Sequence, residues 1–263
     1  MQLAGFAGAG IMGLTLGLMG GGGSILTVPL LVYLFEIPGS AATYYSLFIV
    51  GLCAAIGTVP YAQRKLVDFK VGFFFLFPAM LGISISRKVL LPSIPKNSTF
   101  AGLHFSRDVI ILISFGLVMM AAAWSMIQKK KAHTKKSKVS SLLTAFNGLF
   151  VGSISGFVGA GGGFLIVPAL VNGVQIPMEK AIGTSLFIIS MNSFFGFAGD
   201  WLSGNPAQWE LIMKFSFIAL LGIGAGTYLN PYIPGQKLKP LFGWFVLTLG
   251  SFILVKQMRD LGW

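Results

Sequence analysis

A glycine-rich block occurs twice in the chain, and its residue types suit the binding of an anion. The first copy, at 17–29, reads GLMGGGGSILTVP, and the second, at 156–168, reads GFVGAGGGFLIVP. A helix that begins inside a membrane offers backbone N–H groups without intrahelical partners and the positive end of its dipole. Glycine lets the backbone approach an anion closely. The two blocks therefore predict two helix breaks that could replace the water around a small anion.

The predicted substrate-binding residues lie within the two glycine runs and in the apolar segments that follow them. Ser24 comes directly after the first run, where its hydroxyl could cap the next helix or bind the anion. Hydroxyls in membrane helices also bond back to their own backbone, and Asn192 could either line the path or tie helices together. The predicted set is Gly20, Gly21, Gly22, Gly23, Ser24, Ser46, Gly159, Ala160, Gly161, Gly162, Gly163, Thr184, Ser185 and Asn192.

The glycines also have a purely structural explanation, because small residues let membrane helices pack closely. Isolated pairs such as Gly13/Gly17 and Gly152/Gly156 fit that explanation. The uninterrupted runs of small residues exceed a packing motif, since glycine leaves a helix interior flexible and adds no side chain to pack. We therefore expect breaks at the runs and close packing at the isolated pairs.

The apolar segments carry few other groups that could do chemistry. Neither Lys nor Arg stands in the middle of an apolar block, so we expect dipoles and hydroxyls, rather than a fixed cation, to hold the anion. The single cysteine, Cys53, is expected to be a buried apolar filler. Two loop histidines and one cysteine do not make a metal or acid–base site, so we expect neither an enzyme nor a cofactor.

The composition indicates a protein that crosses a membrane several times. The chain has 263 residues, of which 55% are hydrophobic and only 10% are charged, whereas ordinary soluble domains carry about 25% charged residues. The net charge of +12 gathers in short loops, so it does not indicate binding to nucleic acid. We predict an all-α integral membrane protein with about 8–10 membrane helices or half-helices.

An internal duplication divides the chain into two halves. Matching residues recur at a separation of 139, as in Pro29/Pro168 and Gly57/Gly196. The first apolar block of each half is too long for one span of about 20 residues. It could be a span followed by a re-entrant half-helix, or a helical hairpin with its glycine turn inside the protein. The expected parts are a first membrane repeat at 1–127, a Lys-rich linker at 128–139 and a second membrane repeat at 140–263.

The charges of the loops favour an inverted arrangement of the two halves. If the Lys-rich linker is cytoplasmic, the basic loop at 63–70 is also inside and the acidic loop at 199–210 is outside, as the positive-inside rule expects. Two parallel halves are the alternative. One segment that would lie outside disagrees with the inverted arrangement, because it is flanked by Arg87, Lys88, Lys96 and Arg107.

The paired glycine breaks, each followed by an aliphatic run and a proline, resemble the TauE/SafE-type sulfite exporter family. The element Gly183-Thr184-Ser185 matches the family's Gly-Thr-Ser pattern in the helix after the second break. In the first half the equivalent residues are Tyr44-Tyr45-Ser46, so that copy departs from the pattern and keeps only the serine. The resemblance covers essentially the whole chain.

The resemblance implies a permease of the cell inner membrane that moves small sulfur-containing anions such as sulfite, thiosulfate or organosulfonates. It implies no prosthetic group. The expected partners are the anion and the lipid bilayer, without nucleic acid, and a homo-oligomer stays open. Two alternatives also stay open: an anion channel of similar architecture and a permease for organic anions without sulfur. Saturable flux and counter-transport would separate a carrier from a channel.

Overall fold

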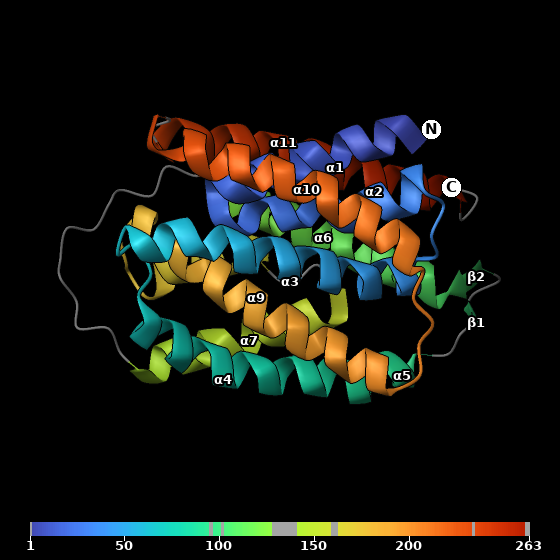
Figure 1. Ribbon diagram of the computed structural model, residues 1–263. Helices are drawn as coiled ribbons and strands as arrows, with labels where there is room; N and C mark the ends of the chain where they lie inside the picture. Colours follow the sequence, from blue (N-terminus) through green and yellow to red (C-terminus); the bar gives the residue numbers. More distant parts are fainter. Residues whose placement is uncertain are drawn as a thin grey trace.

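Long helices make up almost all of the described chain. The computed structural model describes residues 2–94, 97–100, 103–127, 141–158, 163–232 and 235–260. The first half contains α1 (Gln2–Met19), the 3-10 segment η1 (Gly20–Leu26), α2 (Thr27–Leu34), α3 (Gly39–Gln63), α4 (Phe69–Ile85), the π-helical turn η2 (Ser86–Leu90), α5 (Leu91–Ser93) and α6 (Arg107–Ile127) (Figure 1). The second half contains α7 (Ser141–Val158), α8 (Gly163–Pro168), the π-helical turn η3 (Ala169–Gly173), α9 (Met178–Leu202), α10 (Trp209–Leu229), the 3-10 turn η4 (Asn230–Tyr232) and α11 (Gly235–Asp260).

The helices have the length and the apolar surface that a bilayer requires. Six helical segments of the described chain are long and apolar enough to cross a membrane. Their outward side chains are large and apolar, as at Leu81 and Phe217, which are 63% and 65% exposed. The predicted all-α membrane architecture is confirmed. One small addition is an antiparallel β-hairpin, β1 (Asn97–Phe100) with β2 (Leu103–Ser106), just before α6.

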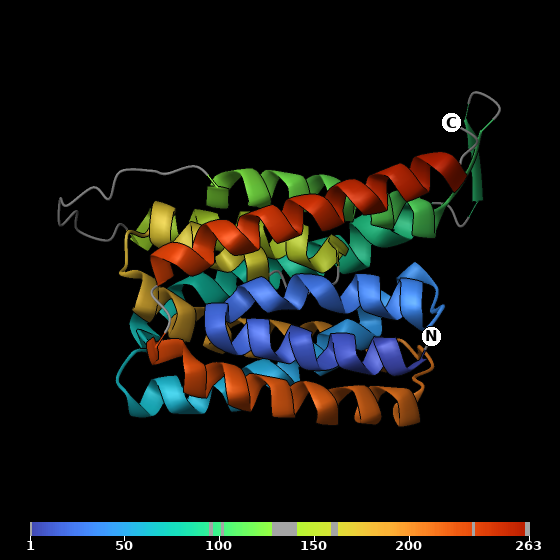
Figure 2. The same ribbon diagram turned by 90° about the horizontal axis from the view of Figure 1, so that it is seen from above.

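The first apolar block folds back on itself as a helical hairpin. The returning segment runs along α1, because a Cβ at Gly8 would lie 2.6 Å from Leu30 and the rings of Phe6 and Phe35 are 5.2 Å apart. Figure 2 shows α1 between α2 and α10. The chain reverses at Gly20, whose φ of +68° is in the left-handed region that glycine tolerates. The block is therefore an 18-residue helix followed by a reversal and a shorter returning helix, and both arrangements expected from sequence contain such a reversal.

Helices of the two halves pack against each other in reciprocal pairs. α1 lies parallel to α10, with Gly13 against Ala219 and Gly17 against Ile223. α7 lies parallel to α4 in the same way, and there Gly152 packs against Ala79 and Gly156 against Ile83. The expected close packing at these four isolated glycines is confirmed, since a Cβ at any of them would strike the backbone of the neighbouring helix.

The centre of the bundle is the crossing of α3 and α9. They run antiparallel, since a Cβ at Gly51 would lie 3.1 Å from Ser193 and one at Gly196 would lie 3.2 Å from Leu47. These two helices are the most deeply buried of the long apolar segments. α6 and α11 also run antiparallel along each other at one side of the bundle (Figure 2). The α3/α9 crossing supplies the wall against which the first glycine break is seated.

Candidate functional site

The first glycine break is a buried 3-10 turn held against α9. Every residue from Gly20 to Leu26 is buried. The N–H of Gly21 donates a 3.3 Å hydrogen bond to Oγ of Ser185. A Cβ at Gly20 would lie 2.6 Å from the same oxygen and 3.0 Å from the carbonyl oxygen of Ile182. The glycine run is therefore required for close approach to α9 as well as for the reversal of the chain.

Two side chains from distant segments cap the end of α1 that leads into this turn. The hydroxyl of Tyr61 donates a 2.8 Å hydrogen bond to the carbonyl oxygen of Gly17. Nδ2 of Asn230 donates a 2.7 Å hydrogen bond to the carbonyl oxygen of Leu18. The last four carbonyl groups of a helix have no intrahelical partner, so these bonds satisfy two of them. Sequence reasoning missed both residues, because neither lies near the glycine run along the chain.

The two glycine blocks meet in the structure. A Cβ at Gly163 would lie 2.8 Å from both Cα and the carbonyl oxygen of Gly21, and one at Gly21 would strike the backbone of Gly163. Such contact between two backbones is open only to glycine. Gly163 also faces Ile189 near the middle of α9. The predicted residues Gly159, Ala160, Gly161 and Gly162 lie outside the described residues.

The predicted serines all form hydrogen bonds within their own segments. The hydroxyls of Ser24, Ser46 and Ser185 donate to the carbonyl oxygens of Gly21, Thr43 and Ile182 at 2.7–2.8 Å. The expectation that Ser24 caps the following helix is wrong. α2 begins at Thr27 and has no side-chain cap, because η1 continues the turn for two residues beyond Ser24. Ser185 is the serine whose oxygen also receives a backbone N–H of the first break.

Thr184 positions a helix end, and a residue of the other half has the same role. The N–H of Asp68, the residue before α4, donates a 2.9 Å hydrogen bond to Oγ1 of Thr184. The N–H of Gln208, the residue before α10, donates a 3.2 Å bond to the hydroxyl of Tyr45. Thr184 and Tyr45 occupy equivalent positions in the two halves. The departure from the family pattern at Tyr45 therefore preserves this hydrogen bond.

Asn192 differs from the other predicted residues because its amide lacks hydrogen-bond partners. The residue is 1% exposed, and neither Nδ2 nor Oδ1 has a partner among the described residues. A buried amide without hydrogen bonds is costly, so such a group calls for an explanation. Asn192 lies two helical turns beyond Ser185 on nearly the same face of α9. It has the free donor and acceptor groups that a desolvated anion or its bound water would use.

A buried ion pair lies at the end of α4, away from the middle of the apolar blocks where the sequence offers neither Lys nor Arg. Arg87 lies in η2 at the end of α4, and its side chain is 7% exposed. Its Nη1 pairs with Oδ2 of Asp200 in the last turn of α9. Sequence reasoning assigned both residues to segment ends in water. The charge of Arg87, one of the four basic residues that disagreed with the inverted arrangement, is therefore neutralised by Asp200 inside the protein and is not a free loop charge.

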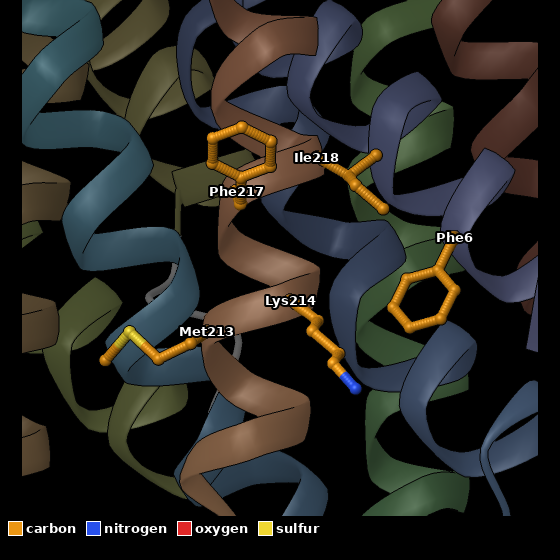
Figure 3. A pocket seen from close by; sticks show the side chains of 5 residues that line it. All are labelled: Phe6, Met213, Lys214, Phe217 and Ile218. Atoms are coloured by element: carbon orange, nitrogen blue, oxygen red, sulfur yellow. The ribbon is translucent and has the colours of Figure 1, made fainter.

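A surface hollow of about 400 Å³ lies elsewhere, between α1 and α10. Figure 3 shows its lining, which is mostly apolar and includes Phe6, Phe217 and Ile218. Phe217 is 65% exposed, so the hollow faces the lipid side of the bundle. It shares no residue with the predicted site. The predicted residues that the structure places near the first break are instead Gly163 and Ser185, with Asn192 further along α9.

Comparison with known proteins agrees with this geometry. A family described as "Sulfite exporter TauE/SafE" matches residues 5–253. This chain belongs to the TauE/SafE sulfite exporter family. The matched region includes both glycine breaks and the α3/α9 crossing. The family resemblance expected from the glycine blocks is thereby confirmed.

Relatives across the family have names that agree on membrane transport. A "probable membrane transporter protein" of Xylella fastidiosa is 27% identical over 262 residues, covering 96% of this chain and 94% of that protein. YunE of Bacillus subtilis, also named a probable membrane transporter protein, is 26% identical, and the match covers 84% of this chain and 85% of YunE. MJ0441 of Methanocaldococcus jannaschii, named in the same way, is 26% identical, with 93% and 92% covered. No solved structure matches the chain. The chain is a multi-pass membrane protein of a transporter family.

Proposed function

We propose that this protein is a secondary permease that carries small sulfur-containing anions, such as sulfite, thiosulfate or organosulfonates, across the cell inner membrane. The observation that carries the proposal is the contact of Gly21 with Gly163, because it brings the two glycine breaks together inside the bundle. Exposed backbone N–H groups at such breaks can replace the hydration of an anion. The family description names sulfite export, which agrees with this substrate class.

The site would bind its anion loosely enough to release it. Backbone dipoles and the hydroxyl of Ser185 replace water around the anion, while Asn192 adds a free amide. In this proposal Ser24, Ser46 and Thr184 support the backbone that presents these groups. Binding by dipoles suits a carrier, since a full opposite charge at the centre would slow release. An inside-negative membrane potential would favour outward movement by about 2.3 kcal/mol per charge per 100 mV.

The inverted arrangement of the repeats 1–127 and 140–263 is part of the proposal. Its support is the reciprocal packing of α1 on α10 and of α7 on α4, with Ala79 and Ile83 matched by Ala219 and Ile223. The equivalent helices α3 and α9 run antiparallel where they cross, as a two-fold axis in the membrane plane requires. Alternating access would then be a rocking of one hairpin and its partner helices against the other.

The loop charges support one orientation of the proposed carrier in the membrane. Arg64 and Lys65 lie between α3 and α4, and Lys70 lies in the first turn of α4, at the end of the bundle where α6 ends and α7 begins (Figure 1). The Lys-rich linker at 128–139 connects α6 to α7, so both basic segments belong to one side. We propose that this side is cytoplasmic, because short basic loops stay inside. The N-terminus of α1 and the Arg87–Asp200 pair then lie towards the outer side.

Reconstitution into liposomes tests the proposal, with sulfite, thiosulfate and sulfoacetate as substrates. Gly21→Ala would push a methyl group into the backbone of Gly163, so we expect flux to fall at least about tenfold. Gly224→Ala is the matched control, because a Cβ there meets nothing within 4 Å. Its flux should equal that of the unmodified protein. Equal loss in both variants would remove the glycine breaks from the mechanism.

Two further measurements separate the alternatives. Labelled substrate loaded inside the liposomes should exchange with unlabelled substrate outside if the protein is a carrier. A channel would instead give large flux without exchange or saturation. Acetate and other carboxylates should compete weakly, and transport of carboxylates alone would overturn the assignment to sulfur-containing anions.

A further inference from the structure

The strongest unexplained feature outside the glycine breaks is the side chain of Arg87. It lies in the π-helical turn η2 at the end of α4 and points into the protein, where its side chain is 7% exposed. A buried charge in a membrane-spanning segment is expensive and usually marks an ion or substrate pathway. π-helical turns inside helices are also frequent at functional sites.

The ion pair with Asp200 uses only part of the guanidinium. Nη1 contacts the carboxylate, whereas Nε and Nη2 are buried and have no hydrogen-bond partner among the described residues. These two nitrogens lie on the same edge of the planar group, and that edge can hold two oxygens of one anion with parallel hydrogen bonds. A purely structural pair would be expected to satisfy this edge, since unpaired buried charged donors are costly.

Arg87 is placed along the same face of α9 as the proposed internal site. Ser185, Asn192, Gly196 and Asp200 fall within an arc of about 80° on that helix. Gly196 is the position beside the guanidinium, and a Cβ there would lie 3.7 Å from Nε. Along this face, Ser185 at the first break and Asp200, the partner of Arg87, are about 20 Å apart. The unpaired amide of Asn192 lies between them.

The equivalent place in the other half carries no charge. The packing pairs that match Ala79 and Ile83 with Ala219 and Ile223 make Thr227 the equivalent of Arg87. Tyr61 is the equivalent of Asp200 at the separation of 139 residues. Oγ1 of Thr227 bonds to Gly224 of its own helix and Tyr61 caps α1, so both are satisfied by the fold. The charged pair is therefore a feature of one end of the bundle alone.

We propose that the free Nε–Nη2 edge of Arg87 is a second binding station for a small oxyanion, between the outer end of the bundle and the glycine breaks. This rests on the proposed transport function and adds a residue to its pathway. Asp200 keeps the empty station neutral, and its carboxylate competes with the anion for the same guanidinium. An arriving oxyanion takes the free edge, and the nearby negative charge of Asp200 then promotes its release.

The test measures the dissociation constant for sodium sulfite by calorimetry on purified protein, with sodium chloride at equal ionic strength as the control. Asp200→Asn removes the competing charge, so sulfite should bind about tenfold more tightly. The double variant Arg87→Gln/Asp200→Asn removes the station without leaving a buried charge unpaired, so it should still fold. Its affinity should fall about 10- to 100-fold, which is the range for hydrogen bonds to a charged group. Arg87→Lys keeps the charge but loses the two-nitrogen edge, so its affinity for sulfite should lie between those of the unmodified protein and the double variant.

The same variants, together with Gly21→Ala, distinguish an error in the proposed Arg87 site from an error in the proposed transport function. Unchanged affinity in the double variant, together with lost flux in Gly21→Ala, would overturn the station and leave the permease proposal standing. If acetate binds to the unmodified protein, sulfur-containing anions do not, and the double variant loses acetate, the station stands and the sulfur assignment falls. If neither sulfite, thiosulfate nor acetate binds to the unmodified protein, the station is overturned as well.

Discussion

The hydroxyl of Tyr61 donates a 2.8 Å hydrogen bond to the carbonyl oxygen of Gly17, near the end of α1. α1 itself packs mainly against α10 and also contacts α2 and α3. Tyr61 is 1% exposed and lies in the last turn of α3. Because Gly17 belongs to the unsatisfied end of α1, the bond fixes where the first hairpin turns. The end of α1 is thereby joined to the last turn of α3.

Removal of this hydroxyl should loosen the hairpin. Tyr61→Phe should lower stability by about 1 kcal/mol, since one buried carbonyl loses its partner. In detergent this corresponds to a fall of about 2–4 °C in the apparent melting temperature. Tyr228→Phe is the control, because Tyr228 is 68% exposed and its hydroxyl forms no such bond. An equal shift in the two variants would show that the Tyr61 bond does not hold the hairpin.

The left-handed backbone of Gly20 gives a second prediction. Alanine at a φ of +68° is strained by about 1–2 kcal/mol, and at Gly20 its Cβ would also approach Oγ of Ser185 to 2.6 Å. Gly204→Ala carries similar strain at a φ of +79° but meets nothing within 4 Å. Both variants should therefore melt earlier, while only Gly20→Ala should lose transport. Transport lost in both would mean that strain alone explains the effect.

The equivalent bonds of Thr184 and Tyr45 allow binding and folding to be separated. Thr184→Val and Tyr45→Phe each leave unpaired the N–H of the residue just before a helix, Asp68 or Gln208, so each should lower stability by about 1 kcal/mol. If Thr184 also contacts the anion, only Thr184→Val should weaken the stabilisation of the protein by added sulfite. Thr184→Ser keeps the hydroxyl and should restore both properties. Sulfite stabilisation that is equal in Thr184→Val and Tyr45→Phe would limit Thr184 to its structural role.

The unpaired amide of Asn192 should lower the stability of the protein and support transport. Asn192→Leu removes two buried polar atoms without partners, so stability should stay equal or rise by about 1–2 kcal/mol. Transport should fall, because the anion loses the amide on its path. Asn230→Leu is the contrasting variant, since it breaks a 2.7 Å bond to Leu18 and should melt earlier. A destabilised Asn192→Leu variant with normal transport would make Asn192 a structural tie.

The glycine breaks could be located from sequence because their signal is local. Four consecutive glycines at 20–23 cannot continue an ordinary helix, and the structure turns at the first of them. The close packing at Gly13 and Gly152 was predictable for a similar reason, since small residues spaced along a helix have few other uses in a membrane. The residue at which α2 begins, and its lack of a side-chain cap, were not predictable. Ser24 has the right residue type, but the 3-10 turn continues past it to Leu26.

The Arg87–Asp200 pair shows what lies beyond sequence reasoning. Each residue stands near the end of an apolar segment, and such residues usually reach water. Whether they reach water or each other depends on α4 and α9 ending side by side, which is a property of the packed bundle. The same is true of Tyr61 and Asn230, which meet α1 from α3 and from the end of α10.

The sequence by itself determined the membrane class, the duplication and the places where helices break, because hydropathy and glycine content act over a few neighbouring residues. Only the tertiary structure decided that the first block is a hairpin, that Gly21 touches Gly163, and that Arg87 is buried with an open edge. Those relationships join residues far apart in the chain. They depend on which helix faces pack together, and no local pattern of residue types contains that information.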